Sequence, residues 1–437
     1  MMFDLVIKNA RLALARDIIE ADIAIGNGKI LRIAKDIMAE RVIDAHGLLV
    51  LPGMVDVHVH FRDPGLTHKE DWYSGSSAAV AGGVTCVVDH PNTIPPTTSV
   101  ESFKVKLREA EKKSIVDFGI NAGVVRAAEL KGLWESGVTA FGEIFLAEYM
   151  GMLSVDDDIL LKSLHVIADL GGIACIHAED EQIIRESIEK LENKTNPSAH
   201  SLSRPNFSEV AAMAKAIGLA QDTCANLHIC HLSTKEGLGL IGAGVTSEVT
   251  PHHLFLSQND WDRLGTFGKT NPPLRSELDR DNLWAGLYRI DIIASDHAPH
   301  TIEEKKQDIW SAPAGVPGVE TSLPLMLSAV KKGIISLQRV VELMSTNPAR
   351  IFCLREKGEI AVGKDADLVF VDLNDVKPIR DRNLHSKAGW TPFEGMDAVF
   401  PKMTFVRGEI MYDGEIVGEK GHGHFVPGRG ADKTIYV

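Results

Sequence analysis

The two ends of the chain show the alternation of apolar and polar residues that is typical of β-strands. Near the start, "DLVIKNARLAL" (residues 4–14) alternates, and "DIAIGNGKILRIAKD" (22–36) carries Asn27-Gly28 between two apolar runs. An Asn-Gly pair in this setting is a strong signal for a β-hairpin. Near the end, "DADLVFVDLN" (365–374) and "MTFVRGEIMYDGEIVG" (403–418) read as short strands separated by turn residues. Both ends are therefore predicted to be β-structure.

The middle of the chain, from about residue 52 to 360, repeats a different unit. A short β-branched run ends in polar residues, and a stretch with helical spacing follows, such as "SVESFKVKLREAEKK" (99–113). The runs include "GVTCVVDHP", "GGIACIHAED", "ANLHICHLST", "GVTSEVTPHH" and "IDIIASDHAPH". Strands that alternate with helices predict parallel βα units, and this many units predict an α/β fold of the (β/α)8 TIM barrel type.

The polar residues at the strand ends are of the kinds that bind metal ions. In a barrel, functional side chains sit at the C-terminal ends of the strands. His58 and His60 in "DVHVHFRDPG" are two residues apart, so both imidazoles point to the same face of a strand. Four further candidates follow at later strand ends: Glu143, His177, His231 and Asp296. One strand-end histidine is more often structural, but the recurrence at five strand ends predicts one metal centre. Nitrogen and oxygen ligands suit zinc, with manganese or cobalt as alternatives.

Composition narrows the class of protein. Of 437 residues, 44% are hydrophobic and 24% are charged, as in ordinary globular proteins. The net charge of −14 gives no global attraction for nucleic acid or anionic membrane, so an anionic substrate needs a local arginine or a metal. Five cysteines without a CxxC pair indicate reduced thiols. The sequence shows no signal peptide or membrane span, and a cytoplasmic protein is expected.

Several of these segments together resemble the dihydroorotases of the amidohydrolase superfamily. The segments are "DVHVHFRDPG", "GGVTCVVDHPNTIPP", "HAED", "CHLST", "TPHHLFL", "NPPLR", "SDHAPH", "GVPGVET" and the late "GKDADLVFVD". The resemblance covers nearly the whole chain. It implies a metal-dependent barrel (52–362) flanked by a small β-sandwich domain that both ends form (1–51 and 363–437). It also implies the reversible hydrolysis of dihydroorotate to N-carbamoyl-aspartate in pyrimidine synthesis.

The resemblance assigns the metal ligands. His58, His60 and Asp296 match the ligands of one ion, and His177 and His231 match those of a second. In the family a carboxylate, most often a carbamylated lysine, bridges the two ions. Here "GVTAFGEIFLAEYM" (137–150) contains no lysine, and Glu143 occupies the equivalent place. Glutamate is already an anion and needs no carbon dioxide, but its reach is shorter, so one or two zinc ions are expected. The alternative for Glu143 is a strand-end ion pair.

The chemistry expected of such a site is metal-assisted hydrolysis. Zinc lowers the pKa of a bound water to about 7, which makes hydroxide available at neutral pH. Asp296 is predicted to be the catalytic residue as well as a ligand. It would take a proton from the attacking water and return it to the leaving ring nitrogen.

Arg62 is predicted to bind the substrate, because a guanidinium matches a carboxylate in a bidentate fork and dihydroorotate carries one beside its ring. By resemblance, Arg62, Asn92 and His300 bind that carboxylate. Asn271 and the backbone around Pro317-Gly318 hold the polar edge of the ring. The alternative for Arg62 is a salt bridge to Asp63 or Asp71.

Three further expectations concern neighbouring residues. Asp89 would orient a ligand histidine, and His90 would pack under the metal site or donate to it. The charged segment "TIEEKKQDIW" (301–310) is predicted to be a mobile lid or a solvated loop. His252 and His253 are given no ligand role.

Two other functions stay open. An allantoinase or hydantoinase would share the metal residues, but Arg62 and "TPHH" argue against it. A catalytically inactive scaffold for aspartate transcarbamoylase is a less favoured alternative, because all four candidate histidines are present. A homodimer is the commonest symmetric assembly, and an active enzyme could also associate with aspartate transcarbamoylase.

Overall fold

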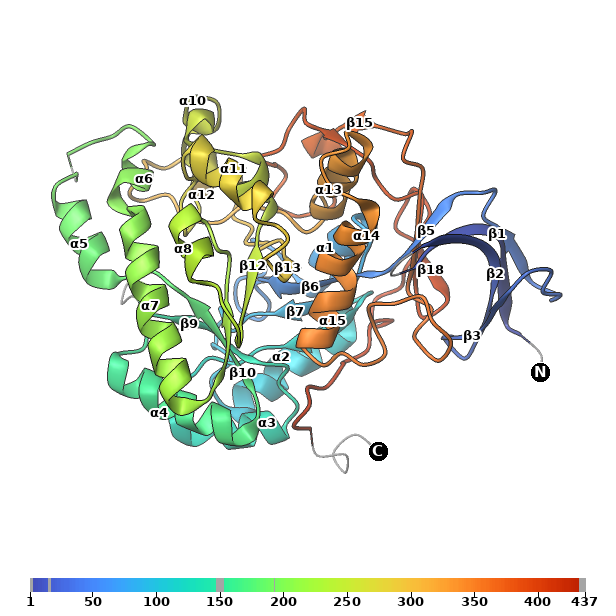
Figure 1. Cartoon of the computed structure of the whole chain (residues 1–437), viewed down its shortest axis with the longest axis horizontal. Helices are drawn as coiled ribbons and strands as arrows, with labels where there is room; N and C mark the ends of the chain where they lie inside the picture. The colour runs from blue at the N-terminus through green and yellow to red at the C-terminus, as the bar shows by residue number, and fades with distance from the viewer. Residues whose placement is uncertain (1–2, 15–16, 147–152, 192, 432–437) are drawn as a thin grey trace.

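The computed structural model describes residues 3–14, 17–146, 153–191 and 193–431. Within these ranges, eight parallel strands form a barrel (Figure 1). They are β6 (Met54–Val59), β7 (Val84–Asp89), β8 (Asp117–Ile120), β9 (Phe141–Phe145), β10 (Ile173–His177), β11 (Asn226–Ile229), β12 (Val245–Val249) and β13 (Ile292–Ile293). The predicted α/β barrel is confirmed.

The barrel is not one continuous hydrogen-bonded ladder. β6, β7 and β8 form one sheet, and β9 to β13 form a second. Two single bridges join the sheets, one between Ala122 and Phe141 and one between Val59 and His297. Apolar side chains such as Val57, Val88 and Ile292 fill the interior, so packing holds the two sheets together where hydrogen bonds are few.

Helices follow the strands and cover the barrel. They are α1 (Trp72–Ala81), α2 (Val100–Lys113), α3 (Leu130–Glu135), α4 (Asp157–Leu170), α5 (Glu181–Glu189), α6 (Ala199–Ser203), α7 (Asn206–Thr223), α8 (Lys235–Leu240), α9 (Pro251–Phe255), α10 (Trp261–Leu264), α11 (Glu277–Ala285), α12 (Ile302–Lys305), α13 (Ser322–Lys331), α14 (Leu337–Val341) and α15 (Asn347–Ile351). Many start at a capping side chain. Asp71 and Ser74 form a capping box on α1. None of the helices in the described part of the chain has both the length and the apolar character needed to cross a membrane.

The two chain ends share one sheet of eight strands, which lies beside the barrel in Figure 1. Its strands are β1 (Leu5–Ala13), β2 (Ile18–Gly26), β3 (Lys29–Ala34), β4 (Val42–Asp44), β5 (Leu49–Pro52), β14 (Leu368–Val371), β17 (Met403–Val406) and β18 (Glu409–Tyr412). β14 pairs antiparallel with β5, which joins the C-terminal strands to the N-terminal ones. The small β domain built from both ends is confirmed, whereas the exact limits 1–51, 52–362 and 363–437 stay predictions.

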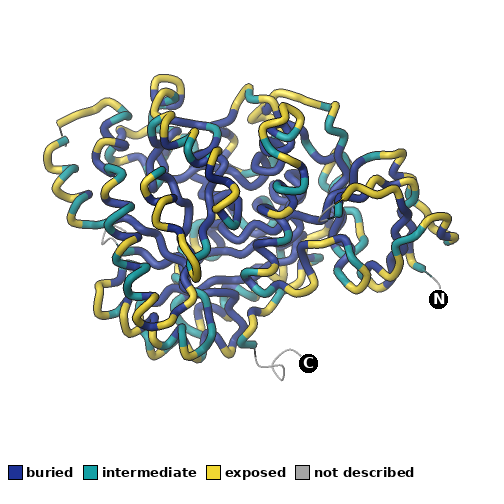
Figure 2. Tube along the Cα trace, viewed as in Figure 1, coloured by how far each residue is buried: buried dark blue, intermediate teal, exposed yellow. Residues whose placement is uncertain are grey.

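Local sequence explains this sheet. Asn27 and Gly28 both have positive φ, at 52° and 74°, in the predicted hairpin between β2 and β3. Inward-facing residues such as Leu12, Phe370 and Phe405 are fully buried and form a core separate from that of the barrel. Figure 2 shows a buried centre in each of the two parts, with exposed residues along the outside.

The segment after β18 returns to the barrel. The Phe118 N–H donates to the His424 carbonyl at 3.0 Å, and the Val426 N–H donates to the Phe118 carbonyl at 2.8 Å. The tail therefore lies beside the beginning of β8, at the end of the barrel opposite to the predicted site.

Candidate metal centre and substrate cavity

Glu143 lies at the centre of a buried cluster at the C-terminal ends of the barrel strands. It belongs to β9, and its Oε1 is 2.8 Å from His177 Nδ1 and 2.7 Å from His231 Nε2. Its Oε2 is 3.6 Å from His58 Nε2 and 3.8 Å from His60 Nε2. The two oxygens of one carboxylate therefore face two separate pairs of imidazoles.

Asp296 completes the cluster on the side of the first histidine pair. Its Oδ1 is 3.4 Å from His58 Nε2 and 3.1 Å from His60 Nε2. The structure thus brings together all six residues that the sequence predicts as ligands, although their binding of metal stays a prediction. Burial raises the pKa of Asp296 to about 6, although His58 and His231 act against this rise.

The backbone bends sharply where it presents several of these side chains. Arg62, His231 and Asp296 have φ values of 61°, 33° and 46°, in the left-handed region that residues other than glycine rarely adopt. Such conformations persist only where the surrounding structure holds them, and they concentrate at functional sites.

The cluster fits a metal centre. The ligating atoms of His58, His60 and Asp296 lie within 4.8 Å of one another, and those of Glu143, His177 and His231 do the same. His58 Nε2 is buried and has no hydrogen-bond partner among the described residues. Burying an unpaired imidazole nitrogen is unfavourable, so a bound cation would complete this set of donors.

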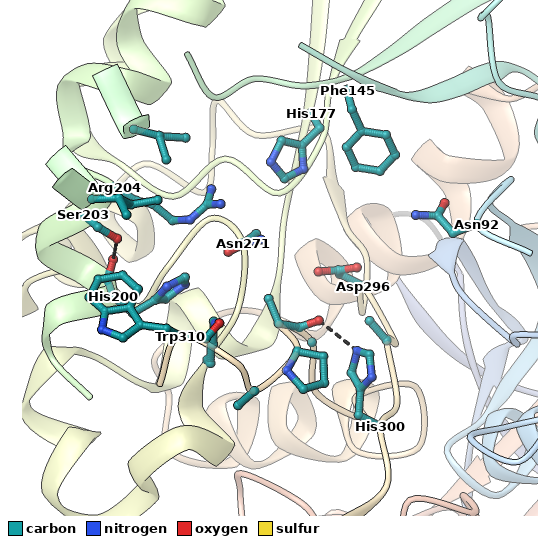
Figure 3. A pocket seen from close by; sticks show the side chains of 18 of the residues that line it. Asn92, Phe145, His177, His200, Ser203, Arg204, Asn271, Asp296, His300 and Trp310 are labelled. Carbon is teal, nitrogen blue, oxygen red and sulfur yellow. Dashed lines mark hydrogen bonds between the residues drawn. The ribbon is translucent and has the colours of Figure 1, made fainter. Parts of the chain in front are cut away.

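A cavity of about 620 Å³ opens beside the cluster. Figure 3 shows His177 and Asp296 on its wall with Asn92, Asn271 and His300. Arg62 also lines the cavity. Four of the predicted substrate-binding side chains therefore face one space.

Pro317 and Gly318 do not line the cavity; Pro313, Ala314 and Gly315 do. The Gly318 N–H donates to His297 Nδ1 at 3.1 Å. This donor, expected to face the substrate ring, is already bonded within the protein.

Polar atoms without partners mark the substrate side of the cavity. Within the described residues, Arg62 Nε and the side-chain oxygens of Asn92 and Asn271 are buried and lack a hydrogen-bond partner. Arg62 forms no ion pair with Asp63 or Asp71 in the described structure, because those carboxylates bind Lys113 and Lys387. The salt-bridge alternative for Arg62 is therefore not what the structure shows.

His300 is held in place on this wall. Its Nε2 donates to the Ala314 carbonyl at 2.9 Å, and its Nδ1 accepts from Lys69 Nζ at 3.1 Å. Its Nε2 is also 3.3 Å from Arg62 Nη2. Both ring nitrogens are therefore already engaged, and His300 shapes the space beside the guanidinium.

The amidohydrolase family pattern matches residues 49–411. The chain belongs to the amidohydrolase family. The dihydroorotase of Methanosarcina acetivorans is 50% identical over 98% of this chain and 96% of its own length. The dihydroorotase of Halobacterium salinarum is 44% identical over 94% of this chain and 97% of its own length. Among solved structures, an L-hydantoinase (dihydropyrimidinase) from Arthrobacter aurescens has a TM-score of 0.95, with 35% identity over 98% of this chain and all of its own.

In this amidohydrolase, two carboxylates that sequence reasoning missed contact ligand-type histidines. Glu248 on β12 contacts His58 Nδ1. Glu179 is 2.8 Å from His177 Nε2 and also pairs with Arg204. The sequence does single out Glu248, because a charged residue in the strand "VTSEV" is unusual inside a barrel.

The expected partner role of Asp89 is corrected by the structure. Asp89 pairs with Lys106 and accepts the Phe61 N–H at 2.6 Å, and it orients no ligand histidine in the described residues. Lys106 is fully buried, so the Asp89 carboxylate already has a buried cation as its partner. The packing prediction for His90 is confirmed, because its ring stacks on His58 with centroids 4.1 Å apart.

The segment 301–310 forms part of the cavity wall through Trp310. Lys305 in α12 is fully buried. Its ammonium donates to the carbonyls of Lys269, Pro313 and Gly315 at 3.0–3.1 Å. These bonds favour a fixed wall over the predicted lid.

Proposed function

We propose that this protein catalyses the reversible hydrolysis of dihydroorotate to N-carbamoyl-aspartate. The observation that carries the proposal is the buried Arg62, which faces the same cavity as the six-residue cluster and has no carboxylate of Asp63 or Asp71 to pair with. A guanidinium held in this way suits a substrate with a carboxylate beside its reacting ring. The relatives named dihydroorotase support the same substrate.

We propose zinc as the metal, with one or two ions per chain. His58, His60 and Asp296 would hold one ion, His177 and His231 the other, and Glu143 would bridge them. When bound, the metal supplies Lewis acidity, which activates water and polarises a carbonyl.

The remaining steps belong to the side chains of the protein. Arg62 and Asn92 would hold the substrate carboxylate, and Asn271 would bind the polar edge of the ring. Asp296 would accept a proton from the attacking water and deliver it to the ring nitrogen as the amide bond breaks. The buried walls would keep the reacting amide away from bulk water.

A hydantoinase is the second candidate. It is favoured by the similarity to the L-hydantoinase structure and by the far side of the cavity. There α5 contributes Ile184 and Ile188, which could receive an apolar substituent on a five-membered ring. Such a substrate lacks the carboxylate that Arg62 would bind.

The deciding experiment is hydrolysis of L-dihydroorotate by zinc-replete protein, followed as loss of ultraviolet absorbance, with allantoin and a 5-substituted hydantoin run alongside. Turnover of dihydroorotate alone is expected. Turnover of a hydantoin or allantoin instead would show that Arg62 serves another purpose. A protein that binds metal but turns over none of the three would contradict the proposal and favour the scaffold.

We further propose a cytoplasmic homodimer. Its association with aspartate transcarbamoylase stays a prediction, and co-purification of the two proteins would test it.

A further inference from the structure

Glu248 is a buried carboxylate outside the predicted ligand set, yet it contacts the cluster directly. It is 1% exposed and lies on β12. Its Oε1 contacts His58 Nδ1 and accepts the His231 N–H at 3.3 Å. One oxygen therefore contacts two of the residues that would hold metal, and each of those residues belongs to a different proposed metal position.

The second oxygen of Glu248 is also engaged. Its Oε2 is 3.2 Å from His228 Nε2, and His228 Nδ1 is 2.9 Å from Thr246 Oγ1. An ionised carboxylate only accepts hydrogen bonds, so His228 donates its Nε2–H to Glu248. All three donors thus point at the carboxylate, which is the arrangement that keeps a buried anion stable.

The contact decides which nitrogen of His58 faces the cluster. An ionised carboxylate only accepts hydrogen bonds, so His58 carries its proton on Nδ1. Nε2 then faces Glu143 and Asp296, at 3.6 Å and 3.4 Å, and is the nitrogen left to bind a cation. A metal-binding histidine commonly donates its other N–H to a carboxylate, which fixes the tautomer and the ring orientation.

The position of Glu248 adds a second effect. His58 belongs to the three-stranded sheet of the barrel, whereas Glu248 belongs to the five-stranded one. The contact therefore crosses between the two sheets. The hydrogen bond to the His231 N–H also supports the residue whose φ is 33°.

We propose that Glu248 is a positioning residue for the metal centre: it fixes the tautomer and orientation of His58 and holds the turn that presents His231. This inference rests on the proposed metal-dependent function. Glu248 touches neither substrate nor the reacting atoms, so its effect passes through the two histidines.

Metal competition tests this proposal without using turnover. The parent protein, Glu248→Gln, Glu248→Asp and the control Glu320→Gln are each equilibrated with zinc and increasing chelator, and bound zinc is measured. Glu320 is a buried carboxylate that pairs with His385 and forms no ion pair with the six cluster residues in the described structure. Loss of such a supporting partner typically weakens metal binding by about 10–100-fold. We expect this loss for Glu248→Gln, a smaller loss for Glu248→Asp, and none for Glu320→Gln.

The outcomes separate this inference from the proposed function. A folded Glu248→Gln protein with the zinc affinity of the parent would overturn the inference, and so would a fall in unfolding free energy of the metal-free protein with unchanged affinity. If the parent protein binds no zinc, this result would instead contradict the proposed metal-dependent function.

A second measurement serves if Glu248→Gln does not fold. In the zinc-loaded parent labelled with ¹⁵N-histidine, we expect the His58 proton on Nδ1, assigned with a His58→Gln spectrum. A proton on Nε2 would contradict the proposal.

Discussion

At the scale of single residues, Glu143 places one carboxylate between two pairs of imidazoles. Both oxygens are used, at 2.7–2.8 Å on one side and 3.6–3.8 Å on the other. The longer contacts lie on the side of His58 and His60, where Asp296 adds a second carboxylate. The Glu143 carboxylate thus lies closer to His177 and His231. The carboxylate of Asp296 lies near the other pair, His58 and His60.

Replacing Glu143 by glutamine should reduce metal binding. The amide keeps the shape of the side chain but removes the negative charge that faces four imidazoles, so zinc content after dialysis should fall below that of the parent. The control is Glu320→Gln, which changes a buried carboxylate elsewhere. Equal zinc content in Glu143→Gln and the parent would refute the bridging role.

Replacing Arg62 by lysine should weaken substrate binding while zinc content stays unchanged. A lysine ammonium cannot reproduce a bidentate contact with a carboxylate, so KM for dihydroorotate should rise by about tenfold or more. Steady-state kinetics with measured zinc content provide the test. Unchanged kinetics would mean that another group binds the carboxylate.

Lys269 gives a prediction about pH. Burial, helped by the charge of Arg204, lowers the pKa of Lys269 to about 8 from 10.5. The folded protein therefore binds fewer protons than the unfolded chain between these values, and its stability rises as pH increases from about 8 toward 10.5. Lys269→Met lacks this contribution. Urea unfolding at pH 7.5 to 9.5 should show the parent gaining stability relative to the variant, and a constant difference would contradict the assignment.

The sequence predicted the six cluster residues because their spacing and strand-end positions follow from chain periodicity and the resemblance. It could not predict that Glu248 would reach His58. That contact joins strands far apart in sequence across the barrel interior, and only the packed fold brings them together. Nor could the sequence show that Arg62 forms no ion pair with Asp63 or Asp71 in the described structure, where these carboxylates pair with Lys113 and Lys387.

At the scale of elements, the segment around α12 shows how composition can mislead. The charged sequence 301–310 predicts a solvated loop or lid, but Lys305 turns inward and bonds three carbonyls. One of them belongs to Gly315, which follows the Ala314 that fixes His300. The buried side chain of Lys305 thus anchors this part of the cavity wall.

Lys305→Met should loosen this wall. Three carbonyls would lose a donor. The Lys269 carbonyl still accepts the Gly315 N–H at 2.9 Å, whereas a buried carbonyl that is left unsatisfied costs about 1–3 kcal/mol. Urea unfolding should therefore show lower stability, and KM for dihydroorotate should rise because His300 is less well held. The matched control is Lys306→Met, which changes the exposed next residue. Equal behaviour of the two variants would argue against the anchoring role.

At the scale of the whole molecule, Lys357 connects the barrel to the terminal sheet. Its ammonium contacts Asp117 at the start of β8 and lies 2.8 Å from both Asp365 and Asp367, which precede β14. Asp117 also accepts the His424 N–H from the returning tail at 2.8 Å. One buried cation therefore joins three parts of the chain.

Lys357→Met should destabilise the protein as a whole, because it leaves three buried carboxylates without their shared cation. Removing one partner of a buried ion pair costs about 3–5 kcal/mol. Denaturant unfolding of this variant, compared with Lys332→Met at an exposed ion pair, would measure the effect. A loss no larger than that of the exposed control would contradict the proposed connection.

The shared terminal sheet also determines when its strands can pair while the protein is being synthesised. Leu49 of β5 pairs with Val371 of β14. More than 300 further residues must therefore be synthesised after β5 before β14 leaves the ribosome and can pair with it. Until then the edge of β5 that β14 later covers is open to other strands. The barrel between them can begin folding during this interval, since chains generally fold domain by domain as they are synthesised. β5 therefore gains its neighbour β14 only after the barrel segment between them has been synthesised.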